Sequence, residues 1–349
     1  MFKKILNHFK RDIGIDLGTA NTLLYVKGRG IVINEPSVVA INTRTEQILA
    51  VGNEAKEMLG KTPPHIVTTR PLTGGIISDF EVTEKMLHYF IEKICEGSMN
   101  FFNRPRVVIG APLEITEVER KAISDATMSA GAKEVWIVEE PMAAAIGSRM
   151  PIQEPMGNFI VEIGGGTTEI AVISLSGIVT WRSLKIAGDE LNKNIVAYAR
   201  DIFNLLLGEK QAEEIKIKIG SAIELSEPMQ FPMRGRDMIT GLPKEVMISD
   251  SQVREAMTKS LRHIVDNIKE TLEKTPPELV ADIHERGILI SGGGALLRGV
   301  DQLIARAAEI PVRVSDDPLT SMVRGAGALL DEDDLLKSVA VNPTSAKYA

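Results

Sequence analysis

Residues 15–23 read Ile-Asp-Leu-Gly-Thr-Ala-Asn-Thr-Leu, and residues 161–170 read Val-Glu-Ile-Gly-Gly-Gly-Thr-Thr-Glu-Ile. Both stretches follow one order: strand, carboxylate, apolar residue, glycine-rich turn, threonine, strand. An internal repeat constrains the architecture more than any single motif does. We therefore expect two similar α/β halves, each presenting one such turn, that face each other across a cleft.

The two turns have the composition of phosphate-binding hairpins. A glycine-rich turn lets backbone N–H groups approach a phosphate without obstruction by Cβ atoms, and neighbouring threonine hydroxyls can donate as well. The preceding acids, Asp16 and Glu162, suit a hydrated Mg²⁺ that bridges the phosphates, because Mg²⁺ prefers oxygen ligands and keeps most of its waters. The alternative is two unrelated β-turns, each with a solvated acid. Two turns in register favour the metal–nucleotide site.

A third glycine cluster, residues 292–295 (Gly-Gly-Gly-Ala), follows a predicted strand at Gly287–Ser291. We expect a helix after it, over Leu297–Ala308. Three glycines permit a flat base or ribose to approach the backbone closely. The alternative is a tight strand-to-helix turn. Only the combination of this cluster with the two hairpins is a specific signal of a nucleotide site.

Composition bounds the function. A chain of 349 residues is long enough for two domains of ordinary size. Its formal net charge of −7 argues against a protein that binds nucleic acid by broad phosphate neutralisation. The single cysteine, Cys95, excludes an internal disulfide and fits a reducing cytosol. Since no uncharged apolar run approaches the ~18 residues of a membrane span, we expect a cytoplasmic protein.

Hydrophobic periodicity predicts strands alternating with helices. The Pro- and Gly-punctuated stretch Glu227–Pro243 indicates an irregular β subdomain, and Val339–Ala349 indicates a loose tail. The expected helices are Val82–Glu96, Glu117–Ala130, Met142–Gly147, Glu190–Asn204, Ala212–Ile223 and Ser251–Glu273.

Several longer stretches resemble the MreB family of bacterial actins. They are residues 14–22, residues 138–147 (Val-Glu-Glu-Pro-Met-Ala-Ala-Ala-Ile-Gly), the run from Gly164 and residues 291–298 (Ser-Gly-Gly-Gly-Ala-Leu-Leu-Arg). The resemblance extends from about residue 12 to about residue 335. Hsp70 proteins and sugar kinases share the turns but not the intervening sequence. The chain also has no room for the peptide-binding region of an Hsp70.

This resemblance implies an actin-like (ribonuclease H-like) α/β fold. Two duplicated α/β domains, each a mixed five-stranded sheet with a smaller subdomain, would hold the nucleotide in a central cleft. The implied boundaries are a membrane-binding helix at 1–11, subdomain IA at 12–34, 68–145 and 318–337, subdomain IB at 35–67, subdomain IIA at 146–181 and 246–317, subdomain IIB at 182–245 and a flexible tail at 338–349.

The resemblance also implies the roles of individual residues. Asp16 would organise the Mg²⁺ shell, with Glu162 acting through water. Glu140 would orient the attacking water, with Thr167 and Glu162 as the other catalytic residues. The nucleotide contacts would come from Gly18, Thr19, Ala20, Asn21, Gly164, Gly165, Gly166, Thr167, Gly188, Glu213, Lys216, Gly292, Gly293, Gly294 and Ala295.

Two of these roles have simpler alternatives. Glu140 could only stabilise a helix N-terminus beside Pro141, which is worth about 0.3–1 kcal/mol. Glu213 and Lys216, three residues apart, could form a surface ion pair.

Two positions depart from the family pattern. Glu162 stands where the family usually has Asp, and Asn192 ends a stretch that usually reads Gly-Gly-Asp-x-x-Asp. A longer carboxylate at residue 162 could change metal coordination or water placement and slow hydrolysis. The resemblance therefore predicts nucleotide binding but does not predict the rate of hydrolysis.

The N-terminus has the pattern of an interfacial helix. Phe2, Ile5, Leu6 and Phe9 share one face of a helical projection, and basic residues occupy the other, as in helices that lie on anionic lipid. The alternative is a helix docked on the protein's own core. Phe101 and Phe102 resemble the membrane-inserting loop of the family, with a surface hydrophobic plug as the alternative.

The implied function is a slow ATPase that assembles with itself into paired protofilaments on the inner face of the cell membrane. There it would organise cell-wall elongation and maintain rod shape, with RodZ-like and MreC/MreD-like proteins as partners. The cofactors would be ATP or ADP and Mg²⁺, and nucleic acid would not be a partner. The alternative is a small-molecule kinase or another soluble ATPase of the superfamily.

Overall fold

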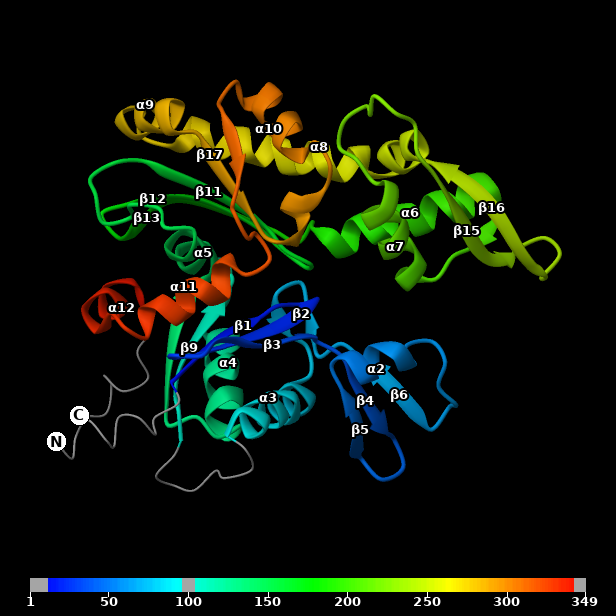
Figure 1. Cartoon of the computed structure of the whole chain (residues 1–349), viewed down its shortest axis with the longest axis horizontal. Helices are drawn as coiled ribbons and strands as arrows, with labels where there is room; N and C mark the ends of the chain where they lie inside the picture. Colours follow the sequence, from blue (N-terminus) through cyan, green and yellow to red (C-terminus); the bar gives the residue numbers. More distant parts are fainter. Residues whose placement is uncertain (1–11, 96–103, 342–349) are drawn as a thin grey trace. The chain divides into compact units, whose positions relative to one another are not determined.

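The computed structural model describes residues 12–95 and 104–341. The chain divides into two compact units, and each is described by itself (Figure 1). The first unit comprises Met1–Glu154, Leu175–Gly177 and Thr320–Ala349, and the second comprises Pro155–Ser174 and Ile178–Leu319.

Among the described residues, the first unit is built on a five-stranded mixed sheet of order β10-β9-β1-β2-β3. β1, β9 and β10 run parallel, whereas β2 runs antiparallel to both of its neighbours. The strands are β1 (Ile13–Leu17), β2 (Asn21–Val26), β3 (Gly30–Pro36), β9 (Arg106–Ala111) and β10 (Glu134–Glu139). The helices are α3 (Phe80–Cys95), α4 (Glu117–Ser129), α5 (Glu140–Gly147), α11 (Ser321–Leu329) and α12 (Asp333–Val339).

The period-two alternation of β1 assigns helices to the two faces of this sheet. Ile13, Ile15 and Leu17 point into a core that includes the buried sides of α3 and α4. Gly14 points the other way, and a Cβ there would stand 2.9 Å from the backbone nitrogen of Gly327 in α11. Therefore α3 and α4 cover one face, and α11 with its neighbour α5 covers the other.

A smaller three-stranded sheet of order β5-β4-β6 belongs to the same unit. Its members and neighbours are β4 (Val39–Asn42), β5 (Gln47–Val51), α2 (Asn53–Met58), β6 (Ile66–Thr69) and the short pair β7 (Leu72–Thr73) and β8 (Ile76–Ile77).

The second unit repeats the plan of the first. Its described residues form a five-stranded sheet of order β13-β12-β11-β17-β18, in which β11, β17 and β18 are parallel and β12 is antiparallel to β11. The repeat read from the sequence is therefore confirmed. The strands are β11 (Asn158–Ile163), β12 (Thr168–Ser174), β13 (Gly177–Leu184), β17 (Ile288–Ser291) and β18 (Val312–Val314).

Helices and a second small sheet complete this unit. The helices are α6 (Gly188–Phe203), α7 (Glu209–Ile219), α8 (Asp250–Lys274), α9 (Pro277–Arg286), the 3₁₀ helix η2 (Gly293–Leu296) and α10 (Val300–Ala308). The small sheet consists of β14 (Leu205–Leu206), β15 (Gln230–Asp237) and β16 (Pro243–Ser249).

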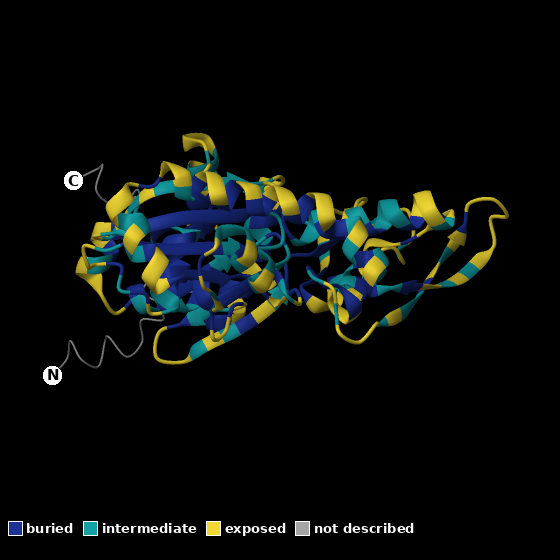
Figure 2. Cartoon of the chain, turned by 90° about the horizontal axis from the view of Figure 1, so that it is seen from above, coloured by how far each residue is buried: buried dark blue, intermediate teal, exposed yellow. Residues whose placement is uncertain are grey.

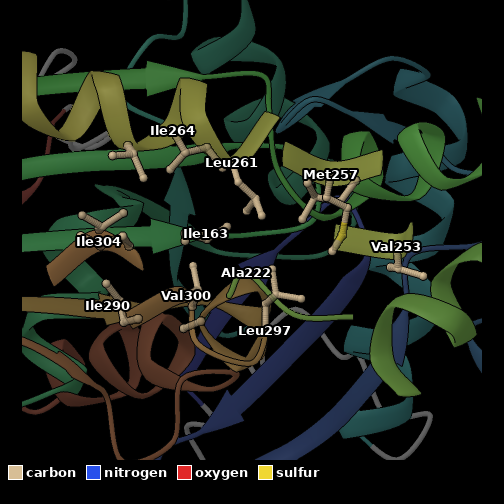
Figure 3. Close-up of a cluster of buried hydrophobic side chains, with 14 of the residues drawn as sticks. Ile163, Ala222, Val253, Met257, Leu261, Ile264, Ile290, Leu297, Val300 and Ile304 are labelled. Atoms are coloured by element: carbon tan, nitrogen blue, oxygen red, sulfur yellow. The ribbon is translucent and has the colours of Figure 1, made fainter. Parts of the chain in front are cut away.

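The core of the second unit is formed by strand β11 and the apolar face of α8. Val253, Met257, Leu261 and Ile264 recur at helical spacing on α8, and Figure 3 shows them gathered with Ile163. In Figure 2 several helices show exposed residues alternating with intermediate or buried ones along their length. This is the pattern of amphipathic helices that cover a sheet.

The structure corrects three predicted elements. The stretch predicted as irregular, Glu227–Pro243, forms most of a regular antiparallel hairpin, β15 and β16. The helix predicted to begin at Leu297 begins at Val300, because Gly299 adopts a positive φ of 71° after the 3₁₀ turn. The helix predicted over Ala212–Ile223 ends at Ile219, before Gly220.

The chain end also differs from the expected loose tail. Val339 closes α12, and Ala340 pairs with Val138 of β10, so residues up to 341 are packed. The first unit extends through Glu154, beyond the boundary expected at residue 146. The division into four subdomains stays a prediction.

The structure contains no helix long and apolar enough to cross a membrane within residues 12–95 and 104–341. The residues predicted to contact the membrane lie outside the described residues. They are Phe2, Ile5, Leu6, Phe9, Phe101 and Phe102.

Candidate functional site

The β1–β2 hairpin of the first unit holds the first predicted phosphate turn. A Cβ on Gly18 would stand 2.7 Å from the backbone oxygen of Asn21, so only glycine fits this turn. Ser37 braces the turn from outside: its hydroxyl donates to the Gly18 carbonyl at 2.6 Å, and its N–H donates to the Ala20 carbonyl at 3.0 Å. The turn is therefore held by contacts that do not use its own N–H groups.

Thr19 of the same turn is held by a contact with another segment. Its buried hydroxyl accepts a hydrogen bond from the Gly75 N–H at 3.0 Å. Sequence reasoning missed both braces, Ser37 and Gly75. They lie 19 and 56 residues from their partners, so no local pattern could have indicated them.

Asp16 lies on the α5 and α11 face of the first sheet, since it is two residues from Gly14 on β1. Part of the residue contacts solvent, but its carboxyl group is surrounded by protein. This desolvation raises the pKa of Asp16 to about 7. A carboxylate held in this way is destabilised unless a cation comes close to it.

Gly110 lies between Asp16 and Glu140. The parallel register of β1 and β9 pairs Ile15 with Ile109, so the next pair along brings Asp16 beside Gly110. A Cβ on Gly110 would stand 3.4 Å from Cγ of Glu140. A Cβ there would also collide with the terminal methyl of Met322 in α11, so the absence of a side chain at residue 110 makes room for Met322 beside the two acids. Sequence reasoning also missed this glycine, although its place at the carboxyl end of a buried strand was a usable signal.

Glu140 is the first residue of α5 and follows β10 directly. Since β1, β9 and β10 are parallel, their carboxyl ends meet at one edge of the sheet, and this edge carries both Asp16 and Glu140. The neighbouring Glu139 is partly buried, and this burial raises the pKa of Glu139 although the charge of Arg120 acts to lower it. The two acids predicted to serve metal and water are thus brought together within one unit.

The acidic side chains at this edge of the sheet fit Mg²⁺ in their charge. Asp16 has no ion pair with a lysine or arginine in the part of the chain that the structure describes, so a cation would supply charge that the protein does not. In the same residues, no group of three or more histidine, cysteine or acidic side chains could enclose a metal. Mg²⁺ is commonly bound by one or two carboxylates together with waters and phosphate oxygens, which matches this arrangement.

The β11–β12 hairpin of the second unit holds the second predicted turn, Gly164–Thr167. The Gly164 N–H donates to the Thr167 carbonyl at 2.9 Å and closes the turn. Thr167 is buried. The N-terminus of α6 rests on this turn, because the N–H groups of Gly188 and Asp189 donate to the carbonyls of Gly164 and Gly165 at 3.1 and 2.8 Å.

Lys216 of α7 reaches the same place. Its ammonium donates to the Gly188 carbonyl at 2.7 Å, and a Cβ on Gly188 would stand 3.3 Å from that ammonium. Glu213 precedes Lys216 by three residues and is half-buried on the same side of the helix. The structure therefore groups Gly164, Gly188 and Lys216, and their role toward a nucleotide stays a prediction.

Glu162 is the second-to-last residue of β11, close to the glycine turn. Its neighbours across the sheet are Ser291 of β17 and Glu169 of β12. Glu169 is fully buried and accepts a hydrogen bond from the Ser183 hydroxyl at 2.8 Å. Directly opposed acids repel each other when both are charged. The extra methylene of Glu162 thus lies in a crowded acidic position.

The third glycine cluster follows β17 and packs on the end of β11. A Cβ on Gly292 or on Gly294 would collide with Ile163, and Gly292 also has a positive φ of 79°. These two glycines are needed by the fold itself, in addition to any role toward a ligand. The contact with Ile163 places the cluster next to the Gly164–Thr167 turn.

Two cavities lie elsewhere in the first unit. One of about 390 Å³ is lined by residues such as Asp12, Arg106 and Glu134, at the amino ends of β1, β9 and β10. Another of about 530 Å³ lies between β5 and α3. Neither is lined by a residue predicted to bind nucleotide.

Residues 10–338 match a family model described as MreB/Mbl protein. The chain belongs to the MreB/Mbl family. The cell shape-determining protein Mbl of Bacillus subtilis is 50% identical over 328 residues, which are 94% of this chain and 98% of that protein. The cell shape-determining protein MreB of Escherichia coli K12 is 47% identical and covers 96% of this chain and 97% of its own length. The chain is thus a bacterial actin-like cell-shape protein, and the comparisons give no support to the small-molecule kinase alternative.

Solved structures agree. MreB5 of Spiroplasma citri, crystallised with ADP, superposes with a TM-score of 0.88 at 37% identity and covers 95% of this chain and 98% of that one. The MamK double helical filament superposes with a TM-score of 0.77 at 22% identity, and the match covers 93% of this chain and 99% of that one. At this identity the comparison shows a likeness of fold alone. The actin-like fold predicted from the sequence is confirmed.

Proposed function

We propose that this member of the MreB/Mbl family binds Mg·ATP and assembles into filaments in a nucleotide-dependent manner. One observation carries the proposal: two sheets of the same strand order each bring an acid and a glycine turn to their carboxyl edge. The MreB5 relative, at 37% identity, is solved with ADP and also with AMPPNP, which supports nucleotide binding here.

The chain's own residues would divide the work of binding. The turns Gly18–Asn21 and Gly164–Thr167 offer backbone N–H groups to phosphate oxygens. Asp16 would hold the cation directly, and Glu162 would act through water. Gly188, Glu213, Lys216 and residues 292–295 would line the adenosine. Bound Mg·ATP would supply the phosphoryl group and the neutralising charge.

Hydrolysis would require a positioned water more than covalent chemistry, as in other phosphoryl transfers. Glu140 and Thr167 are the residues we assign to that water. A positioned carboxylate contributes typically 10²–10⁴-fold to such a step. We propose slow hydrolysis, because the neighbourhood of Glu162 and Glu169 is crowded with acids.

The test combines nucleotide binding with sedimentation of the full chain. We expect pelleting with Mg·ATP, little pelleting without nucleotide and saturable binding of a fluorescent ATP analogue. Glu140→Gln should keep binding while phosphate release falls by about 10²-fold or more. If the unaltered chain bound no adenine nucleotide in the presence of Mg²⁺, the proposal would be wrong.

In the cell, we propose that the filaments lie on the inner face of the membrane and organise cell-wall elongation in rod-shaped cells. The resemblance to MreB suggests RodZ-like and MreC/MreD-like partners. Phe101 and Phe102 would assist the N-terminal helix at the lipid surface. Changing both to Ser should reduce co-sedimentation with vesicles that contain anionic lipid, and unchanged co-sedimentation would remove this part of the proposal.

A further inference from the structure

A groove of about 530 Å³ runs along the outer edge of the small sheet in the first unit. Its walls come from β5, the first turn of α2 and one side of α3, with Ser129 at the end of α4 closing one side. The volume lies within the ~300–1,000 Å³ typical of ligand sites. No residue assigned to nucleotide binding contributes to it.

One wall of this groove is an edge strand. In the described part of the chain, β5 pairs with β4 and has no partner on its other side. Natural edge strands are commonly protected by charged residues or proline. β5 reads Gln-Ile-Leu-Ala-Val and contains neither. Its one irregularity is a register shift opposite Ala40 and Ile41, which makes Leu49 an extra residue on β5.

Apolar side chains from the two walls are exposed. Leu49 of β5 is 45% exposed and Tyr89 of α3 is 39% exposed, and both line the groove. An apolar side chain placed in the groove would remove both from water.

The polar lining of the groove is mainly acidic. Glu54, Glu84 and Glu92 contribute carboxylates, Lys85 contributes an ammonium, and His88 contributes an imidazole whose Nε2 lies 3.8 Å from the Glu92 carboxylate. The Lys85 ammonium is already bonded to Glu81 at 2.6 Å, and Glu81 does not line the groove. The groove therefore complements a basic ligand.

We propose that this groove binds an extended segment of a partner protein, which adds a strand to β5 and carries apolar residues alternating with lysine or arginine. Strand addition supplies backbone hydrogen bonds, and side-chain pockets supply specificity. With five residues in β5, the paired segment would span about 17 Å. Alternate side chains of the segment would face Leu49 and Tyr89, and basic ones would meet Glu54, Glu84 and Glu92.

The test uses a labelled heptapeptide of alternating lysine and valine, capped at both ends, and measures its fluorescence anisotropy with the full chain at about 0.15 M salt. Saturable binding is expected. Leu49→Lys and Glu84→Lys should each weaken it about tenfold, since each places a like charge against the peptide. A peptide with proline at its centre should bind about tenfold more weakly, because it lacks a backbone donor and cannot follow the strand.

Val67→Lys is the matched control. Val67 lies on β6, the opposite edge of the same sheet, and is 46% exposed, almost the same as Leu49. Binding should be unchanged in this variant. Absence of saturable binding to the unaltered chain, or equal weakening by Leu49→Lys and Val67→Lys, overturns the proposal. A peptide of residues 1–11 that competed at the groove more strongly than the lysine–valine peptide would identify another copy of this chain as the occupant, and would overturn the assignment to a partner protein.

Discussion

At the residue scale, Asp16 shows how a residue that we propose to bind a cation can work against stability. Its ordinary pKa of 3.8 is raised to about 7 by burial, so the folded chain binds more protons than the unfolded chain between those two pH values. The free energy of unfolding of the metal-free chain therefore falls as the pH rises through this window. The full shift corresponds to roughly 4 kcal/mol, and the actual effect is smaller because part of Asp16 contacts solvent.

Asp16→Asn should therefore stabilise the metal-free chain above pH 7 and weaken its binding of Mg·ATP. The amide keeps the shape of the side chain but cannot ionise, so the cost of a buried charge disappears together with the attraction for a cation. Urea unfolding in EDTA at pH 5 and pH 8 measures the first effect, and titration with a fluorescent ATP analogue measures the second. Equal stability of the two proteins at pH 8 would contradict the argument.

Gly292 is a second residue at which the fold restricts the choice of amino acid. Gly292→Ala should destabilise the second unit by about 3 kcal/mol or more, because the new Cβ meets the backbone of Ile163 and the residue has a positive φ. Gly241 also has a positive φ, of 75°, but a Cβ there meets open space.

Gly241→Ala is thus the control and should cost only about 1–2 kcal/mol. Urea unfolding of both variants separates backbone strain from collision. Equal losses would mean that the contact with Ile163 contributes nothing.

At the scale of elements, the approach of α5 and α11 positions Glu140. A Cβ on Gly147 of α5 would collide with the backbone of Ser321, and a Cβ on Gly325 of α11 would collide with the backbone of Ala143. The two helices therefore contact each other backbone to backbone. A change in their separation would move the first turn of α5 and the carboxylate that begins it.

Gly325→Ala tests this contact. By helix propensity alone, the change should stabilise α11 by about 1 kcal/mol. We expect the opposite sign, a loss of about 2 kcal/mol or more from the collision, together with slower release of phosphate from ATP. Thermal unfolding and a phosphate assay give the two readings, and a stabilised variant would show that the helices can move apart freely.

The same helix explains what the sequence could and could not predict. α11 reads Ser-Met-Val-Arg-Gly-Ala-Gly-Ala-Leu, and its glycines made it a poor helix by propensity, so it was not predicted. The hairpins around Gly18 and Gly164 were predicted because strand, acid and turn are adjacent in sequence. The contacts of Ser37 and Gly75 join distant segments of the chain, and no local pattern reports those.

The β15–β16 hairpin illustrates a second kind of error. Pro232, Gly235 and Pro243 suggested irregular chain, yet each is accommodated in a regular pairing. At Gly235 a Cβ would collide with the backbone of Leu206, so this glycine marks the close approach of β14 and not a break. Proline and glycine thus suggested irregular β structure, whereas tertiary contacts place them inside regular strands.

At the scale of the whole molecule, assembly and membrane contact should be separable. A variant lacking residues 1–11 should still pellet with Mg·ATP, because the predicted nucleotide residues begin at Asp16. Its co-sedimentation with anionic vesicles should fall strongly, since four large apolar side chains and several basic ones are removed. Undiminished vesicle binding by this variant would contradict the assignment of an interfacial helix.

The order of the two units along the chain has a consequence for synthesis on the ribosome. The first unit begins the chain, but α11, which covers β1 and β9, comes from residues 321–329. The second unit comes from Pro155–Ser174 and Ile178–Leu319, with only Leu175–Gly177 between the two stretches. The half that emerges first must therefore wait for the last helices, while the later half can already be complete. A nascent chain stopped at Leu319 should show protease protection of the second unit and digestion of the first, with protection of both only once α11 and α12 have emerged.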